Sequence, residues 1–336
     1  MIKTYANDYS HSAGGKIDMT LAGKFIVPRK LIIPENLIDY LDSYPNKIIV
    51  AELIDTLSRK YNIDPKNLMI GAGSNGIIQN LMHIFFKDCG NLVVPEFSFE
   101  QAEYAATSMG AMIKEVEHKD DFSIDFNKLY QAVDKDTKAV FLCNPNNPTG
   151  IYEDPNTIID FAESIKQPVI VSEASFEYVQ EDGLFENKHT PNNLIKLRSF
   201  SKAYGLSGLR VGYAQMSNQL IEKYKQNTTR FETSSLSILL AKESLDDPAV
   251  NENIIKTNQE REKLQFKLKQ LGINTTKSKS SCFMSTSAYN LDFYNKVEKK
   301  GISLVKVDCS NTNDKYFRVA VQDENTNNQF IEILSK

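Results

Sequence analysis

The chain has 336 residues, which is more than one simple core usually holds, so a large domain with a smaller second domain is expected. Charged residues make up 24% of the chain and the net charge is −4, so no basic excess indicates a nucleic-acid partner or a membrane surface. No apolar run approaches the roughly 18 residues of a membrane-spanning helix. Residues 1–7 lack the apolar core of a signal peptide, so we expect a cytoplasmic protein.

The cysteines and histidines are scattered, and no pair of cysteines has the spacing of a metal site. In a cytoplasmic protein, separate cysteines are expected to be reduced thiols rather than disulfides. We therefore expect no bound metal. The residues are Cys89, Cys143, Cys282 and Cys309, with His11, His83, His118 and His189.

Residues 1–43 are mixed in character and are interrupted by glycines and prolines. This composition predicts an arm that lies across another part of the molecule rather than a domain. Tyr44 then precedes an apolar spacing that is typical of an amphipathic helix, carried by Ile49, Leu53 and Leu57.

A glycine-rich turn at residues 71–76 joins a short predicted strand to a predicted helix. Glycines let the backbone approach an anion closely, and the start of the helix offers free N–H groups. Ser74 and Asn75 are placed to donate to a phosphate. Many such turns hold no ligand, so this interpretation depends on a second hydroxyl cluster further along the chain.

Two apolar runs end in side chains suited to ligand contact, because ligands bind at the carboxyl ends of strands in α/β sheets. Residues 91–95 read as a buried strand that stops at a proline, with Phe97 just beyond. Residues 139–143 lead into an Asn/Pro loop at 144–150, whose prolines fix the loop and present amides such as Asn147. A third strand, predicted to end near Ser172, follows the same pattern.

The stretch at residues 198–213 carries the strongest chemical signal. Lys202 stands between small hydroxyl residues, after a strand-like run and before apolar positions, so we expect it inside the protein. A buried lysine has a depressed pKa and forms Schiff bases with carbonyl cofactors. Ser199, Ser201 and Arg210 around it have the character of a phosphate site. Together these features indicate pyridoxal phosphate.

From about residue 217 the chain reads as helices followed by short strands, which predicts a separate α+β domain. Arg318 lies in the middle of an apolar strand, where it must be paired or bind an anion. The expected fold is α/β, with a mostly parallel sheet flanked by helices. The expected parts are an arm with part of the small domain at 1–43, a cofactor-binding domain at 44–216 and a small domain at 217–336.

These motifs resemble the fold-type-I pyridoxal-phosphate enzymes of aminotransferase classes I and II. The branch of histidinol-phosphate aminotransferase and threonine-phosphate decarboxylase is the most similar. The Asn-Pro-Asn-Asn-Pro-Thr-Gly string at 144–150 and the lysine stretch are the most specific parts. The resemblance implies that Lys202 binds the cofactor and moves protons at the substrate's α-carbon, and that the N-terminal arm covers the active site.

The resemblance also implies the other contacts. Phe97 would stack on the pyridine ring, and Asn147 would donate to the phenolic oxygen. Tyr44 would reach across a homodimer interface to the partner's cofactor, and Arg318 would bind the substrate's α-carboxylate. The residues implied at the cofactor phosphate are Ser74, Asn75, Ser199, Ser201 and Arg210.

The chain departs from the family where Asp-Glu-Ala-Tyr is usual. Alignment on Glu173 puts Ser172 at the aspartate that pairs with the pyridine nitrogen, and Ser175 at the tyrosine that contacts the phenolic oxygen. A carboxylate keeps the nitrogen protonated and the ring a strong electron sink, whereas a hydroxyl can only hydrogen-bond. Three interpretations stay open: Glu173 takes over, the chemistry has moved away from transamination, or the cofactor is held with little activity.

The resulting hypothesis is a pyridoxal-phosphate-dependent aminotransferase similar to histidinol-phosphate aminotransferase. It would act on an amino acid or amino-phosphate as donor and an oxo-acid as acceptor. One alternative is decarboxylation of an amino-acid phosphate, or an elimination or replacement reaction, as Ser172 suggests. The other is a catalytically degenerate protein that binds the cofactor without turnover.

Overall fold

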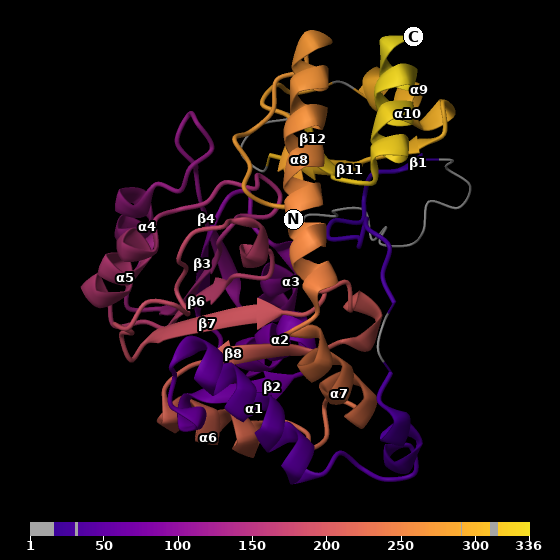
Figure 1. The fold of residues 1–336 in the computed structure, drawn as a ribbon. Helices are drawn as coiled ribbons and strands as arrows, with labels where there is room; N and C mark the ends of the chain where they lie inside the picture. Colours follow the sequence, from indigo (N-terminus) through magenta and orange to yellow (C-terminus); the bar gives the residue numbers. More distant parts are fainter. Residues whose placement is uncertain (1–16, 31–32, 290, 310–314) are drawn as a thin grey trace.

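The computed structural model describes residues 17–30, 33–289, 291–309 and 315–336. Its largest element is a seven-stranded sheet in the order β2-β8-β7-β6-β5-β3-β4 (Figure 1). Neighbouring strands are parallel, except that β8 runs antiparallel to both β2 and β7. The strands are β2 (Leu68–Gly71), β3 (Asn91–Pro95), β4 (Met112–Val116), β5 (Thr137–Cys143), β6 (Val169–Ser172), β7 (Leu194–Ser199) and β8 (Gly212–Gln215).

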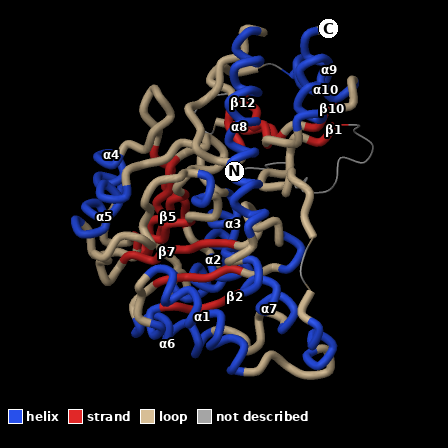
Figure 2. The backbone as a smooth tube through the Cα atoms, viewed as in Figure 1, coloured by secondary structure: helices blue, strands red, loops and turns tan. Residues whose placement is uncertain are grey.

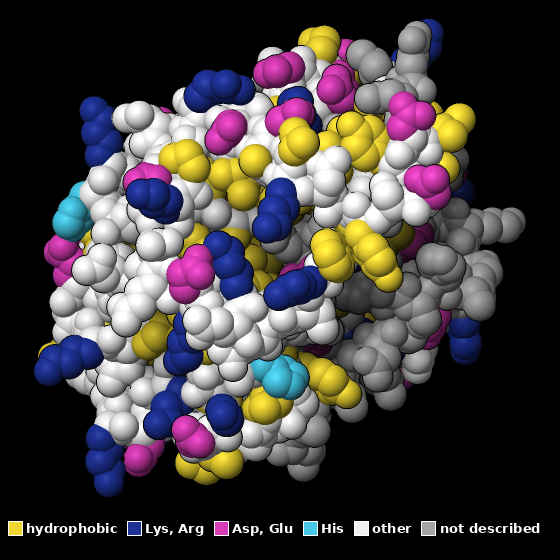
Figure 3. All heavy atoms as spheres, turned by 90° about the horizontal axis from the view of Figure 1, so that it is seen from below, with side chains coloured by type: hydrophobic (Ala, Val, Ile, Leu, Met, Phe, Trp, Pro, Cys, Tyr) yellow, Lys and Arg dark blue, Asp and Glu magenta, His cyan; other side chains and the backbone are white. Residues whose placement is uncertain are grey.

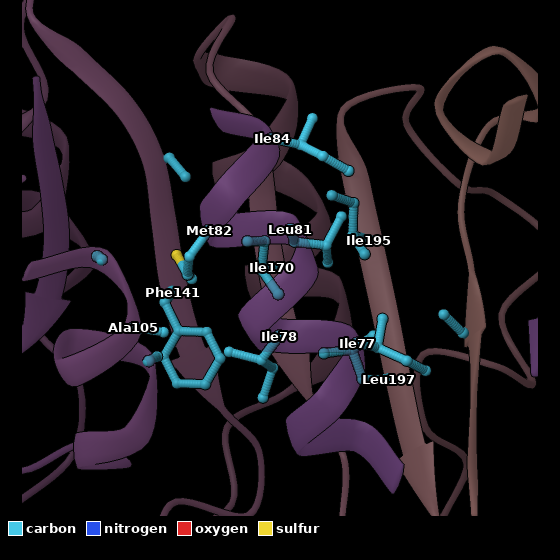
Figure 4. Close-up of a cluster of buried hydrophobic side chains, with 14 of the residues drawn as sticks. Ile77, Ile78, Leu81, Met82, Ile84, Ala105, Phe141, Ile170, Ile195 and Leu197 are labelled. Carbon is cyan, nitrogen blue, oxygen red and sulfur yellow. The ribbon is translucent and has the colours of Figure 1, made fainter. Parts of the chain in front are cut away.

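Helices cover both faces of this sheet, because successive residues of its strands point to opposite faces and are apolar on both. On one face, Ile78 and Leu81 of α2 pack against Phe141 and Ile170 (Figure 4). On the other face, Val140 belongs to a separate core cluster with α4 and α5. The predicted α/β fold is therefore confirmed. These helices are α2 (Gly73–Phe85), α3 (Glu100–Ser108), α4 (Phe126–Ala132), α5 (Pro155–Ser164) and α6 (Asn218–Asn227).

The predicted amphipathic helix after Tyr44 is α1 (Lys47–Tyr61), which starts at an Asn46 cap and buries the three expected apolar residues. These pack with α7 (Ser235–Ser244) and with the β2–β8 edge of the sheet. Short 3-10 helices connect the larger elements. They are η1 (Glu35–Tyr40), η2 (Pro65–Asn67), η3 (Phe176–Tyr178) and η4 (Ser207–Leu209).

A second unit is built around the antiparallel sheet β11-β12-β9, and the long helix α8 runs from the large domain into it (Figures 1 and 2). The strand β1 (Ile17–Asp18) pairs in parallel with β10, so the N-terminal segment joins this unit. The division of the chain at residues 43 and 216 stays a prediction. The other elements are α8 (Pro248–Gln270), β9 (Cys282–Met284), α9 (Leu291–Lys299), β10 (Ile302–Ser303), β11 (Val305–Asp308), β12 (Lys315–Ala320) and α10 (Glu324–Ser335).

In the part of the chain that the structure describes, no helix is long and apolar enough to cross a bilayer. Within the same residues, no group of three or more histidine, cysteine, aspartate or glutamate side chains could hold a metal ion. All four cysteines are free. The cytoplasmic location stays a prediction.

Candidate active site

A cavity of about 490 Å³ lies at the carboxyl edge of the large sheet. The strands β5, β6 and β7 end in its wall with Cys143, Ser172 and Ser199, which is the usual position of a ligand site in an α/β sheet. The second unit closes the cavity with residues from β9 and β12. Other wall residues are Leu21, Ala22, Gly23, Lys24, Ser74, Asn75, Phe99, Gln101, Asn147, Ser175, Ser201, Lys202, Ser207, Arg210, Cys282 and Arg318.

Lys202 follows β7 and is half-buried, with its side chain in the cavity wall. Burial lowers the pKa of Lys202 to about 8, and the positive charges of Arg318 and Arg210 add to the shift. Near neutral pH a useful fraction of this side chain is therefore the neutral amine, which is the nucleophilic and basic form. Its Nζ donates a 3.0 Å hydrogen bond to the carbonyl oxygen of Ala22.

One end of the cavity is built to hold an anion. The helix α2 begins there with no acidic residue in its first turn and no side-chain cap, so its N–H groups and its positive dipole end face the cavity beside Ser74. Arg210 Nη1 lies 3.4 Å from Ser201 Oγ on the other side. Gly73 has a φ of +73°, and a Cβ there would lie 2.9 Å from Arg210 Nη2, so a larger residue would fill the space.

Arg318 is the cation that β12 of the second unit contributes to the cavity wall. It is only 5% exposed, and Nη1 donates to Asn147 Oδ1 at 2.9 Å. None of the ion pairs of the described residues involves Arg318, and its buried Nε has no hydrogen-bond partner. A buried guanidinium without an ion-pair partner and with an unused N–H donor is suited to binding a carboxylate.

Residues 20–24, here called the strap, contact both Lys202 and Arg318, and residues 21–24 form part of the cavity wall. The carbonyl of Ala22 accepts from Lys202, and the carbonyl of Thr20 accepts from Arg318 Nη2. The strap is held in turn by Gln322, whose Nε2 donates to the Leu21 carbonyl at 3.1 Å. Residues 21–24 thus line the site. That the whole arm of residues 1–43 covers it stays a prediction, because residues 1–16 and 31–32 lie outside the described ones.

Ser172 and Ser175 both line the cavity, whereas Glu173 points away from it. Glu173 is fully buried on the other side of the strand end. Its Oε2 accepts from Arg198 Nε at 3.0 Å, and its Oε1 accepts from the Leu184 N–H at 2.9 Å. Both oxygens are therefore engaged, and the structure gives no support to the interpretation in which Glu173 takes over the role of the missing aspartate.

Phe97, expected at the cofactor, does not line the cavity. Tyr44 does not line the cavity of its own chain either, and its predicted contact with the partner's cofactor stays a prediction. Phe97 is buried in a separate cluster, where its ring contacts Phe122. The chain turns after β3, and the aromatic residue that reaches the wall is Phe99, just before α3. Tyr44 is 77% exposed and stacks on Phe231, with 4.8 Å between ring centroids.

The comparison with known families decides the class of the protein. Residues 27–334 match the family described as aminotransferase class I and II. The chain belongs to this family. The predicted resemblance, the enzyme class and pyridoxal phosphate as the cofactor are thereby confirmed.

Histidinol-phosphate aminotransferases are among the similar relatives of this aminotransferase. The one from Bacillus subtilis is 35% identical over 228 residues, which span 66% of this chain and 62% of that protein. Histidinol-phosphate aminotransferase 2 from Carboxydothermus hydrogenoformans is 29% identical over 92% of this chain and 87% of its own.

Solved structures show that the fold is shared across the family. Histidinol-phosphate aminotransferase from Sinorhizobium meliloti, in complex with pyridoxal 5'-phosphate, has a TM-score of 0.86 at 20% identity, covering 97% of this chain and 93% of that one. L-threonine-O-3-phosphate decarboxylase from Porphyromonas gingivalis has a TM-score of 0.76 at 20% identity, covering 95% and 98%.

The cavity of this aminotransferase fits its cofactor on the evidence of its own residues. The uncapped start of α2 and the small residues Gly73 and Gly212 leave a space beside Arg210 for a phosphate; a Cβ on Gly212 would lie 2.5 Å from the Ser74 nitrogen. Lys202, with its lowered pKa, supplies the amine for a carbonyl.

Proposed function

We propose that the chain is an aminotransferase, similar to histidinol-phosphate aminotransferase, whose amino donor carries a second anionic group besides its α-carboxylate, such as the phosphate of an amino-acid phosphate. One observation supports this most directly. Four basic side chains line the cavity and, among the described residues, no acidic one does: the basic residues are Lys24, Lys202, Arg210 and Arg318. Lys202 and Arg210 are assigned to the cofactor and Arg318 to the donor's carboxylate, so Lys24 is the basic residue left for a second anion.

In the proposed arrangement the cofactor phosphate lies against the start of α2 and Arg210. Lys202 meets the carbonyl carbon, and Phe99 takes the place at the ring that was assigned to Phe97. Asn147 and Ser175 contact the phenolic edge. Residues proposed to bind the cofactor are Ser74, Asn75, Phe99, Asn147, Ser172, Ser175, Ser199, Ser201, Lys202 and Arg210.

Bound pyridoxal phosphate supplies a carbonyl that takes up the donor's amine and a ring that withdraws electrons from the bond to be broken. Arg318 binds the donor's α-carboxylate in place of the Thr20 carbonyl, which orients the α-carbon hydrogen toward Lys202. Lys202 then removes this proton as a general base, because its amine is partly neutral near pH 7. An oxo-acid acceptor completes the exchange by the reverse steps.

Lys24 is proposed to bind the donor's distal anion. It lies at the end of the strap, in the cavity wall, and its ion pair with Asp323 is long, at 3.8 Å, and largely exposed. Such a pair contributes little, so Lys24 is free to engage a ligand. In Lys24→Ala, the KM for a phosphorylated donor should rise about tenfold, while that for an unphosphorylated donor should not change.

The test of the function uses the purified holoenzyme with an amino-acid phosphate and an oxo-acid, and compares this donor with histidinol phosphate, which has a phosphate but no carboxylate. Formation of the new amino acid, together with loss of the donor's amine, is the expected result. Lys30→Ala is the matched control for Lys24→Ala, because Lys30 is exposed and lies outside the cavity wall. An equal loss in both variants, or no preference for phosphorylated donors, would contradict the proposed donor.

A second candidate is favoured by Ser172, which faces the cavity without a carboxylate. A weaker electron sink is compatible with decarboxylation, elimination or replacement in place of amino transfer. Release of carbon dioxide or pyruvate without amino exchange would establish one of these reactions and exclude the first proposal. If no substrate alters the cofactor's visible absorbance, the protein is a cofactor-binding protein without turnover.

The homodimer is also proposed here. The face seen from below in Figure 3 exposes hydrophobic side chains among charged ones. Large hydrophobic residues exposed on η1, on the segment that joins it to α1, on α1 and on the loop before α7 are compatible with a covered surface: they are Ile38, Leu41, Tyr44, Ile48 and Phe231. A dimer at micromolar concentration in analytical ultracentrifugation is expected, and Tyr44→Ala with Phe231→Ala should shift it toward the monomer.

A further inference from the structure

The electrostatic character of the cavity wall determines the protonation of a basic atom placed within it. The charged members of the wall are all cations, and no carboxylate of the described residues belongs to it. A pyridine nitrogen is kept protonated by a neighbouring carboxylate, whereas neighbouring cations disfavour the added proton. The wall of this cavity therefore works against a protonated ring.

The carboxylate closest along the chain to Ser172 is that of Glu173, and it is not available to protonate the ring nitrogen in place of an aspartate. Glu173 is 0% exposed, and its two oxygens accept from Arg198 Nε and from the Leu184 N–H. Arg198 is itself only 1% exposed. Turning Glu173 into the cavity would break both hydrogen bonds and remove one carboxylate from a buried guanidinium, which is strongly unfavourable.

Ser172 lines the cavity at the position where the aspartate of the family would meet the ring nitrogen. In pyridoxal phosphate this nitrogen lies across the ring from the carbon that bears the carbonyl, so in a bound cofactor it would lie on the side away from Lys202. Ser172 is the last residue of β6, is 4% exposed and lines the cavity between the ends of β5 and β7. Its hydroxyl is a donor that cannot protonate a pyridine.

We propose that the ring nitrogen in this protein is unprotonated and accepts a hydrogen bond from Ser172, and that Ser172 thereby determines which carbon receives the proton during turnover. The proposal rests on the proposed function only in that the cavity holds pyridoxal phosphate. Whether the donor carries a phosphate does not enter it.

The chemical consequence concerns the proton that Lys202 carries. Lys202 takes the proton from the donor's α-carbon, and the electron pair of that C–H bond remains, shared between the α-carbon and the ring. Amino transfer is complete only when Lys202 delivers the proton to the cofactor carbon. A neutral nitrogen withdraws less electron density, so the pair stays mainly at the α-carbon and the proton returns there.

The first measurement is the ¹⁵N NMR shift of ring-labelled pyridoxal phosphate in the wild-type holoenzyme, because protonated and unprotonated pyridine nitrogens have well-separated shifts. We expect the unprotonated position between pH 6 and 9. Ser172→Asp should move the signal to the protonated position, and Ser172→Ala should leave it unprotonated. A protonated nitrogen in the wild type overturns the proposal, and this result needs no variant to fold.

Ser175→Asp is the matched control, since it introduces the same charge at a second wall position. It should leave the nitrogen unprotonated. If Ser175→Asp protonates the nitrogen as fully as Ser172→Asp does, Ser172 is not the residue that meets it, and the proposal fails.

The second measurement compares deuterium uptake at the donor's α-carbon in D₂O with amino transfer. In the wild type, uptake should exceed transfer, and Ser172→Asp should raise the kcat of transfer about tenfold while KM stays nearly constant. If deuterium uptake at the α-carbon is no faster than amino transfer in the wild type, Ser172 does not direct the proton back to the α-carbon. A different donor chemistry would contradict the proposed function but leave the NMR result intact.

Discussion

The amine of Lys202 donates a 3.0 Å hydrogen bond to the carbonyl of Ala22, 180 residues earlier in the chain. The same short segment accepts from Arg318 through the carbonyl of Thr20. One strap of backbone therefore engages the cation proposed to meet the cofactor and the cation proposed to meet the substrate. A substrate that brings its own carboxylate must compete with the Thr20 carbonyl for Arg318.

Gly23→Ala tests the strap. The residue has a φ of +84°, and a Cβ there would lie 2.6 Å from Lys202 Cδ and 2.8 Å from Lys202 Cα. We expect the substitution to displace the strap and to lower the free energy of unfolding by about 1–3 kcal/mol. Urea unfolding measures the change. Gly208→Ala is the control, because no atom lies within 4 Å of a Cβ placed there; equal effects of the two substitutions would contradict this role of the strap.

The lowered pKa of Lys202 predicts a specific pH dependence in the cofactor-free protein. In the fold this pKa is about 8, against 10.5 normally, so the folded state binds fewer protons than the unfolded state between those values. Burial of the charged Lys202 therefore destabilises the fold most below pH 8, and the free energy of unfolding increases as the pH rises from about 8 to 10.5. Lys202→Met should stabilise the protein more at pH 7 than at pH 10.

Thermal unfolding at the two pH values, with Lys166→Met as an exposed control, measures this difference. Lys166→Met should give the same small change at both. A stabilisation by Lys202→Met that is independent of pH would contradict the burial of the ammonium group.

Arg318→Gln tests the carboxylate site. Loss of a charge-assisted hydrogen bond to the donor should raise KM about 10- to 100-fold. The exposed Arg59→Gln is the control for a general loss of positive charge. Steady-state kinetics with several donors would show the effect, and an unchanged KM for every donor would exclude Arg318 from substrate binding.

Glu173→Gln tests the buried ion pair behind the site. Removing one charge of a buried pair leaves the other uncompensated, so the free energy of unfolding should fall by about 3–5 kcal/mol. Glu117→Gln, which breaks the exposed pair with Lys128, should have almost no effect. Denaturant unfolding of both variants separates the two cases; similar stabilities would mean that Glu186 alone satisfies Arg198.

Much of the candidate site could be predicted because the residues lie at the ends of strands. Ser172, Ser199 and Asn147 are brought together by a parallel sheet, whose carboxyl ends meet at one edge. The glycine-rich segment at 71–76 could likewise be recognised from its composition, but the helix starts earlier than predicted, because α2 begins at Gly73. The apolar runs that mark the strands, and the polar residues that follow them, are sufficient to predict that these side chains lie at one edge of the sheet.

Other contacts depend on geometry that periodicity does not encode. Phe99 rather than Phe97 reaches the wall because of the turn taken after β3. The carbonyls of Thr20 and Ala22 are backbone atoms, so no side-chain pattern marks them. The sequence does not show which buried charges meet. It therefore cannot reveal that Glu173 pairs with Arg198 and is not available to replace the missing aspartate.

The hydrogen bond between Thr20 and Arg318 joins residues 298 positions apart, which affects how the protein is made. A ribosome adding about 5–20 residues per second synthesises the strap many seconds before Arg318. The nascent chain therefore carries Lys202 and the glycine-rich segment of the large domain before Arg318, the residue proposed to bind the carboxylate, has been made. A cofactor that arrives during translation would therefore meet a pocket that is still incomplete and open to solvent. The proposed selection of substrates by Arg318 would begin only after β12 has been made.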